Sequence, residues 1–347
     1  MEDDPVSDGE GEQTVVKEEQ GAPEDKARVC PLTQDTIVPG LSLLCRTGNG
    51  LSHAFVKLDL RDKELTDIAA LSHFVHLRFL DVSNNHLADL SPLKSLTDLL
   101  WLKASVLCDA SHIDNNAVSS FKDQPLGQLP YLQWLSLAGN QLEDMEGLGG
   151  TALESLNLIG NRIQRVHGLH YGHLTNLVTL ELRGNRLDTT DGIYLPNLRR
   201  LYLAQNVIKR LEGLERLERL TTLHLRDNQL ETLDGISPSM TSLQYLNVRG
   251  NLIDSQKALQ SLVPLSSTLR ALVVSENPLA ETEDYRLEVL TCLTHLERLD
   301  KEPISSEEWA EARERIKVGV APAGRDKGPP LGTAASLPAV LYGVAQH

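Results

Sequence analysis

The chain has 347 residues, of which 41% are hydrophobic and only 4% aromatic, a composition that suits many small aliphatic layers better than one large globular core. Its formal charge of −15 at pH 7 disfavours nonspecific binding to nucleic acid and to anionic membranes, because both require an excess of cationic side chains. Because the sequence shows no charged-then-apolar leader and no apolar run of roughly 18 residues, we expect a cytoplasmic protein without a membrane span.

The N-terminal segment is strongly acidic. Residues 1–28 carry ten acidic side chains against Lys17, Lys26 and Arg28, and almost no large apolar ones. Such a segment cannot bury enough apolar surface to offset the entropy that ordering costs, so we predict a disordered acidic tail over residues 1–38. The run from Thr47 to Gly50 lacks the Lys-Ser/Thr ending of a phosphate loop, and we expect a turn before the first strand there.

From about residue 40 the pattern L-x-x-L-x-L-x-x-N-x-L recurs, which is typical of a leucine-rich repeat. Ten copies start at Phe55, Leu77, Leu99, Leu132, Leu153, Leu177, Leu198, Leu220, Leu243 and Leu269. Successive starts lie 21 to 26 residues apart except for one step of 33, so each copy predicts one coil of a solenoid over residues 39–302. The predicted fold class is α/β, with a parallel sheet on the concave face and short helical or 3₁₀ returns on the convex face.

Each copy predicts which side chains face the core. The fourth and sixth residues, such as Leu223 and Leu225, should point inward from a short strand, while the third, fifth and seventh point outward. The ninth residue should turn the chain and bond to the backbone of the neighbouring coil through its side-chain amide. These residues are Asn85, Asn140, Asn161, Asn185, Asn206, Asn228, Asn251 and Asn277. Ten such strands would line a concave surface about 43 Å long.

One copy departs from the pattern. After Ala104 the expected asparagine is missing, and the long step to the next copy predicts a loop insertion over residues 105–128. We therefore expect one rung of the asparagine ladder to be lost at this coil.

The C-terminal end predicts a cap, because a bare terminal coil would expose its core. Leucines and Tyr285 over residues 285–300 form a modified last turn. Ser305 and Glu308 match a capping box, and Trp309 and Ala312 share a face with Ile316, so a cap helix is expected over residues 303–317. Pro, Gly and Ala dominate residues 318–347, which predicts a disordered tail.

The outward positions of the early copies form a predicted aromatic row of Phe79, Trp101 and Trp134. Exposed aromatic side chains in a row are costly unless something covers them, and tryptophan is enriched in interface hot spots. We favour a partner protein as the cover. The alternative is that the acidic tail or the loop after Trp101 lies over them.

The later copies present a different set of predicted protein-binding residues. They are Glu181, Arg183, Arg200, Tyr202, His224, Arg226, Tyr245, Asn247 and Arg249. Arginine recurs at the seventh position of three copies, a basic stripe suited to forked bonding with carboxylates on an acidic partner. The alternative is a solvated face on which the arginines form salt bridges with Glu181 and nearby acids such as Asp227.

Metal binding and catalysis are not expected. His167, His170 and His173 lie on the return side without an acidic or cysteine partner, and the four cysteines form no CxxC pair, so we predict free thiols, no metal and no cofactor. The concave positions hold no Ser, His and Asp set, and His224 has no nucleophile at a matching position. We predict neither enzymatic activity nor a small-molecule substrate.

The repeat form LRDNQLETLDGI at 225–236 and the ending LERLDKE at 296–302 resemble the short cytoplasmic class of leucine-rich repeats typified by a regulator of protein phosphatase 1. A second resemblance, covering about residues 39–302, is to a family of leucine-rich repeat proteins of axonemal radial spokes. It is carried by the residues at 40–60, 89–104, 201–206, 220–229 and 242–251.

The second resemblance implies a structural component of the radial spoke in the axoneme of cilia and sperm flagella, needed for motility, with other radial-spoke proteins as partners. The first implies the alternative, a regulatory or targeting subunit of protein phosphatase 1. The chain departs from the radial-spoke family in the 105–128 insertion and in its Pro, Gly and Ala tail, where the family has glutamate. The resemblance therefore does not imply docking through that tail.

Overall fold

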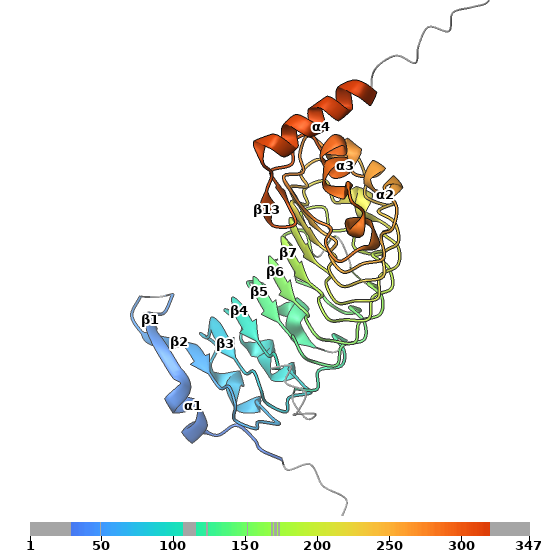
Figure 1. The fold of residues 1–347 in the computed structure, drawn as a ribbon. Helices are drawn as coiled ribbons and strands as arrows, with labels where there is room; N and C mark the ends of the chain where they lie inside the picture. The colour runs from blue at the N-terminus through green and yellow to red at the C-terminus, as the bar shows by residue number, and fades with distance from the viewer. Residues whose placement is uncertain are drawn as a thin grey trace, which may run out of the picture.

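The computed structural model describes residues 29–319 except 49, 107–115, 123, 151, 168, 170, 171 and 173, and these form one curved solenoid (Figure 1). A single sheet of thirteen strands runs through the described residues in chain order. Its strands are β1 (Leu41–Arg46), β2 (His53–Asp59), β3 (Phe79–Asp81), β4 (Trp101–Lys103), β5 (Trp134–Ser136), β6 (Ser155–Asn157), β7 (Thr179–Glu181), β8 (Arg200–Tyr202), β9 (Thr222–His224), β10 (Tyr245–Asn247), β11 (Ala271–Val273), β12 (Arg298–Leu299) and β13 (Glu302–Pro303). Neighbours from β2 to β12 are parallel, so the predicted fold class is confirmed.

Leucines at the fourth and sixth positions stack from coil to coil. Leu201 in β8, Leu223 in β9 and Leu246 in β10 are paired in register and fully buried. Removing a side chain of this size from water stabilises the fold by about 1.5–3 kcal/mol, and each leucine packs against both neighbouring coils. The buried residues therefore form one continuous core along the solenoid.

The eight predicted asparagines are all buried and form a ladder of hydrogen bonds. In a representative rung, Asn228 Nδ2 donates to the carbonyl oxygens of Leu203 and Leu225, each at 3.0 Å, and its Oδ1 accepts from the amide of Ile208 at 3.1 Å. One side chain thus satisfies backbone groups of its own coil and of the preceding coil.

The predicted loss of one rung is wrong. Asn116, at the far side of the insertion, is fully buried, and its Oδ1 accepts from the amide of Leu87 at 2.8 Å. Its Nδ2 lies 3.3 Å from the carbonyl oxygens of Val82 and Ala104, the same set of partners as in the other rungs. The extra residues enter between the strand and its asparagine, so the ladder stays complete at this coil.

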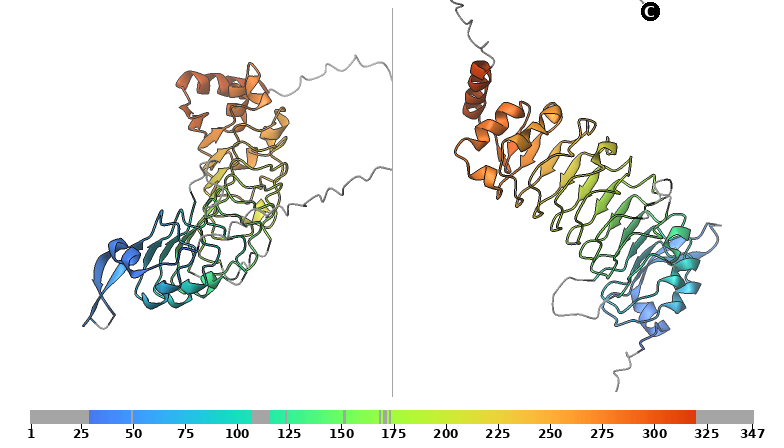
Figure 2. Two further views of the ribbon diagram at one scale, coloured as in Figure 1. Left: turned by 90° about the horizontal axis from the view of Figure 1, so that it is seen from below. Right: turned by 90° about the vertical axis from the view of Figure 1, so that its right-hand side faces the viewer.

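Short helical segments return behind the sheet, as the second view in Figure 2 shows. They are η1 (Ala69–His73), η2 (Ser91–Ser95), η3 (Pro125–Gln128), η4 (Leu214–Arg216), α2 (Lys257–Gln260), η5 (Val263–Leu265) and η6 (Pro278–Glu281). Glycine is required in the tightest returns. Gly235 has a φ of 100°, and a Cβ there would lie 2.1 Å from the carbonyl oxygen of Leu211.

The N-terminal end is covered by a short helix and a hairpin that the repeat pattern does not reveal. Helix α1 (Gln34–Gly40) precedes β1, which pairs antiparallel with β2. Leu32 and Ile37 are buried in the core, so the boundary predicted at residue 39 lies too late in the chain. Their burial shows that this stretch has apolar side chains to pack, unlike the acidic residues before it, which lie outside the described residues.

The C-terminal cap consists of α3 (Tyr285–Cys292), the strands β12 and β13, and α4 (Ser306–Gly319). The capping box forms, since the amide of Glu308 donates to Ser305 Oγ at 3.2 Å and the amide of Ser305 donates to Glu308 Oε2 at 2.8 Å. Ala312 is fully buried and Trp309 packs against the core, so α4 covers the last coil. The helix begins three residues later than predicted, after the short strand β13.

Candidate protein-binding surface

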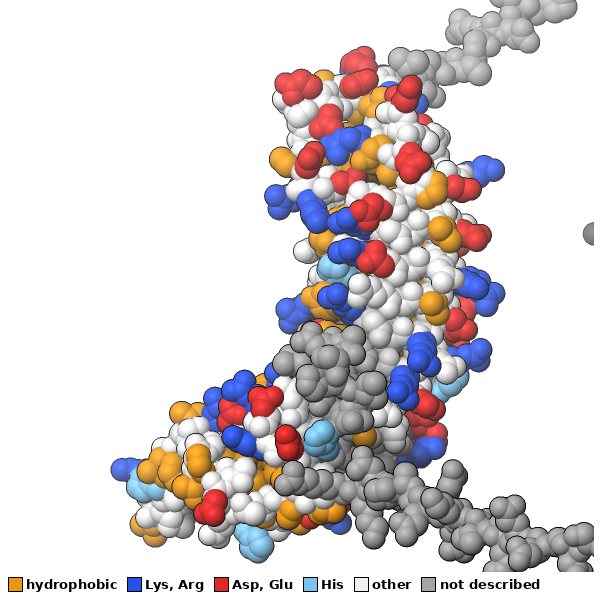
Figure 3. All heavy atoms as spheres, turned by 60° about the horizontal axis from the view of Figure 1, so that its bottom comes forward, with side chains coloured by type: hydrophobic (Ala, Val, Ile, Leu, Met, Phe, Trp, Pro, Cys, Tyr) orange, Lys and Arg blue, Asp and Glu red, His pale blue; other side chains and the backbone are white. Residues whose placement is uncertain are grey.

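The outward positions of the strands form straight rows across the concave face, because neighbouring strands pair in register. The third-position row runs from Lys57 through Phe79, Trp101 and Trp134. It continues through the middle strands to Arg200, Thr222 and Tyr245. Figure 3 shows hydrophobic side chains gathered near the N-terminal end at lower left, and a column of Lys and Arg along the upper left edge.

The predicted aromatic row is present at the N-terminal end. The rings of Trp101 and Trp134 stack with centroids 4.6 Å apart and an interplanar angle of 9°. Phe79, beside Trp101, lines a hollow of about 440 Å³ together with Leu43 of β1. We call the residues Leu43, Leu44, Phe55, Phe79, Trp101 and Trp134 the apolar patch. The tail and most of the loop that could cover it lie outside the described residues, so its cover by a partner stays a prediction.

A second hollow of about 440 Å³ lies over β7 to β10, and we call it the arginine hollow. Its lining residues are Ile159, Glu181, Arg183, Tyr202, Ala204, Gln205, His224, Arg226, Asp227, Tyr245, Asn247 and Lys301. The ring of His224 lies between those of Tyr202 and Tyr245, with both centroid distances 4.9 Å. The two tyrosines therefore cover the faces of the His224 ring, and the stack of three rings is a continuous aromatic surface along the hollow that a partner can contact.

Burial shifts two ionisable groups on this floor. Loss of solvent raises the pKa of Glu181, an effect that the positive charge of Arg200 opposes. Loss of solvent lowers the pKa of His224, which favours the neutral imidazole. Burial thus disfavours the charged form of both groups.

The arginines of the predicted stripe differ in their partners. Arg226 Nε lies 3.1 Å from Asp227 Oδ2, and Arg249 donates to both carboxylate oxygens of Glu276. Arg183 Nε instead donates to the amide oxygen of Gln205 at 2.9 Å. Among the residues that the structure describes, the alternative of ion pairing within the chain therefore holds for Arg226 and Arg249 but not for Arg183.

Two of the other predicted residues also have partners within the chain. Arg200 Nε donates to Thr179 Oγ1 at 3.1 Å. Asn247 is only 6% exposed, and its Oδ1 accepts from the amide of Arg249 at 3.1 Å. Asn247 therefore serves as buried floor, and of the predicted set it has the least surface to offer a partner.

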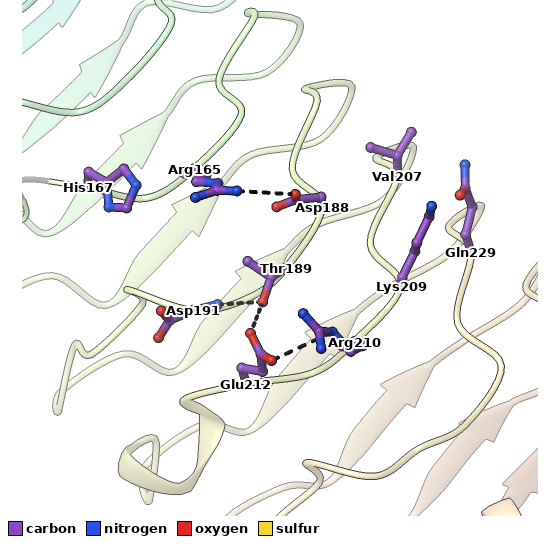
Figure 4. Close-up of a pocket in the computed structure, with 10 residues that line it drawn as sticks. All are labelled: Arg165, His167, Asp188, Thr189, Asp191, Val207, Lys209, Arg210, Glu212 and Gln229. Carbon is purple, nitrogen blue, oxygen red and sulfur yellow. Dashed lines mark hydrogen bonds and ion pairs between the residues drawn. The ribbon is translucent and has the colours of Figure 1, made fainter.

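A further hollow of about 500 Å³ lies at the edge of the returns, where Figure 4 shows its ten lining residues. Two ion pairs lie within it, with Arg165 3.9 Å from Asp188 and Arg210 3.7 Å from Glu212, and the hydroxyl of Thr189 donates to Glu212 at 2.7 Å. His167 lines this hollow, while His170 and His173 lie outside the described residues. Among the residues with described positions, no group of three or more potential metal ligands is found.

Several residues that line or adjoin the two concave hollows were not predicted. Leu43 and Leu44 belong to the hairpin, where no repeat spacing points to them, and Lys301 comes from the turn between β12 and β13. Gln205 and Glu276 follow seventh positions in their copies, so the repeat alignment could have identified them.

No helix in the described part of the chain is both long and apolar enough to cross a bilayer.

Two family models described as leucine-rich repeat match this chain, one over residues 180–322 and one over residues 76–99. Together with the stacked coils and the asparagine ladder, these matches define the class: a leucine-rich repeat protein whose concave sheet is suited to binding other proteins.

Curated relatives identify the family within that class. Leucine-rich repeat-containing protein 23 of Bos taurus is 51% identical over 284 residues, which cover 82% of this chain and 79% of that protein. The Homo sapiens protein of the same name is 50% identical over 290 residues, covering 83% and 81%. The chain therefore belongs to the leucine-rich repeat-containing protein 23 family.

Solved structures share the fold. An internalin (inlF) from Listeria monocytogenes is 26% identical with a TM-score of 0.55, over 70% of this chain and 66% of that chain. A leucine-rich repeat protein of Leptospira interrogans is 22% identical with a TM-score of 0.50, over 78% and 84%. At these identities the likeness concerns the solenoid and not the residues on its concave face.

Proposed function

We propose that this chain is a non-catalytic scaffold of the axonemal radial spoke that holds other spoke proteins against the concave face of its sheet. The observation that carries the proposal is the pair of hollows of different chemistry on one sheet, because such a face offers a partner both an apolar anchor and charged contacts. Leucine-rich repeat scaffolds of this kind are typically non-enzymatic. The place in the spoke is supported by the sequence resemblance described above.

An acidic partner surface fits the arginine hollow. Arg183, Arg226 and Lys301 line it, against the carboxylates of Glu181 and Asp227. Arg183 forms no ion pair within the described residues, and its Nη nitrogens remain for the forked contact that a carboxylate makes. The whole chain is acidic, so this local excess of cations would select the face that an acidic partner meets first.

Affinity purification from flagella tests the proposal. The tagged chain is expected to recover spoke proteins, and its Arg183→Glu, Arg226→Glu, Arg249→Glu triple variant should recover much less, since two of these arginines line the arginine hollow and the third continues the predicted stripe beside it. A matched triple, Arg162→Glu, Arg186→Glu, Arg210→Glu, changes the charge equally at exposed positions outside the arginine hollow and should bind as the wild type does. Thermal unfolding of both triples checks that they fold.

Localisation gives a second readout. We expect a tagged copy to stain the axoneme. Diffuse cytosolic staining, together with recovery of the phosphatase 1 catalytic subunit and no spoke protein, would support the phosphatase-regulator alternative instead. Equal recovery of spoke proteins by the two triple variants would show that the arginine hollow does not bind them.

A further inference from the structure

Leu43 adopts a backbone conformation that a bulky side chain rarely takes. Its φ is 57°, in the left-handed region, although Ser42 and Leu44 on either side pair regularly with Lys57 and Phe55 of β2. Such strain persists only where the surrounding structure imposes it, and it concentrates at binding and switching sites.

The strained backbone places an extra apolar side chain on the concave face. In a regular antiparallel pair Leu43 would lie opposite Val56, which is buried on the core side. Leu43 instead lines the N-terminal hollow with Phe79 and Trp101 and remains 56% exposed.

Neighbouring side chains extend this apolar surface. Leu44 is 58% exposed and pairs with Phe55, which is 44% exposed and shares a strand face with Lys57. Lys57 in turn pairs with Phe79 in the third-position row. Leu43, which shares one hollow with Phe79 and Trp101, therefore joins the hairpin to the stacked tryptophans, with Lys57 at the rim, and such an apolar surface is expected of a docking site.

The charges around the patch select the kind of occupant. Arg61 holds both nearby carboxylates, with 2.6 Å between its Nη2 and Asp59 Oδ2 and 3.6 Å between its Nε and Asp81 Oδ2. Two cations, Lys57 and Arg61, and two acids line the hollow, so its own charge is balanced, and Lys103, opposite Asp81 in the next strand, adds one positive charge beside it. An occupant with carboxylates beside its apolar side chains complements this rim.

The chain's own terminal segments do not have that composition. Residues 1–28 are acidic but contain no Leu, Ile, Phe, Tyr or Trp, and residues 320–347 contain apolar side chains with only Asp326 as an acid. The composition of the rim and the hollow therefore favours another protein over either tail. The loop over residues 107–115 does combine Leu107 and Ile113 with Asp109 and Asp114, so a library that yields no binder would make that loop the occupant.

We infer that the hollow between Leu43 and Trp101 binds a bulky apolar side chain carried on an acidic segment of a partner protein. The inference rests on the proposed scaffold function in assuming a protein partner. It concerns the opposite end of the sheet from the arginine hollow, so an experiment can contradict this inference without contradicting binding at the arginine hollow.

A displayed library of random 16-residue peptides, selected on the full chain, tests this inference. We expect the enriched peptides to combine bulky apolar residues with Asp or Glu. Their affinity, measured by fluorescence anisotropy, should fall at least tenfold for Leu43→Gly and also for Lys57→Glu, which reverses a rim charge. Glycine adopts the left-handed conformation without strain, so Leu43→Gly should unfold at the same temperature as the wild type or higher.

Leu252→Ala removes a leucine that is 51% exposed and lies outside the patch, and this control should leave peptide affinity unchanged. Three results would overturn the inference: enriched peptides that lack acids, peptides that bind Leu43→Gly as tightly as the wild type, and a library that yields no binder. Light scattering provides the last check, because a wild-type dimer that Leu43→Gly abolishes would make a second copy of the chain the occupant.

Discussion

Strands β3 and β4 carry Phe79 and Trp101 at the third position, where strands β8 and β9 carry Arg200 and Thr222. The backbone register and the buried leucines are the same in both pairs. The difference shows that the inward positions determine the solenoid, whereas the outward positions vary without disturbing it. A single sheet can therefore present an apolar patch at one end and the arginine hollow toward the other.

The largest expected effects test the equivalence of the two regions in the core. Leu80→Ala in β3 and Leu223→Ala in β9 each remove a fully buried side chain and should each cost about 2–5 kcal/mol of unfolding free energy. Urea denaturation measures both. A large loss in one region and none in the other would show that the coils are not equivalent.

The asparagine ladder allows a second comparison, between the coil that contains the insertion and a regular coil. Asn116→Ala and Asn228→Ala should each cost about 1–3 kcal/mol, because each leaves buried backbone groups without partners. The exposed Gln164→Ala serves as a control and should change little. If Asn116→Ala unfolds like the control in urea, the insertion does not supply a working rung.

A smaller, pH-dependent effect should distinguish the arginine hollow from the apolar patch. Because burial lowers the pKa of His224, the unfolded chain binds a proton there more readily than the folded chain. The stability that His224 contributes is complete above about pH 6.5 and is lost as the pH falls through its lower folded pKa.

His224→Gln should therefore flatten the decrease of the unfolding temperature between about pH 7.5 and pH 5.5. The raised pKa of Glu181 acts in the opposite direction, since protonation of Glu181 is easier in the folded chain, so its contribution grows at lower pH. Lys57→Gln, on the rim of the apolar patch, should keep the wild-type profile. If the unfolding temperatures of both variants depend on pH in the same way, His224 is not the source of the pH dependence.

Most of the fold could be predicted from the sequence because the coils repeat. The spacing identified the strands β2 to β11, the buried leucines and eight of the asparagines, and it placed Phe79, Trp101 and Trp134 in one row. Residues outside the period were missed. Asn116 was overlooked because an insertion separates it from its strand, although its hydrogen bonds are those of the other rungs.

Conformation and pairing limited the prediction of the candidate site. No sequence rule places a leucine at a φ of 57°, so the contribution of Leu43 to the apolar patch depends on three-dimensional structure. The stripe of arginines was predicted, but the residues that bind them, Gln205, Asp227 and Glu276, decide how much charge each offers. Burial of Asn247 likewise follows from packing that spacing does not reveal.

Photo-crosslinking in flagella tests most directly whether the concave face holds a partner. A benzophenone amino acid in place of Tyr245 lies on the arginine hollow, and one in place of the exposed Leu252 lies outside it. We expect position 245 to crosslink to another spoke protein and position 252 to give little product. Crosslinks from position 252 alone, or from position 245 only to the chain itself, would contradict binding by the concave face.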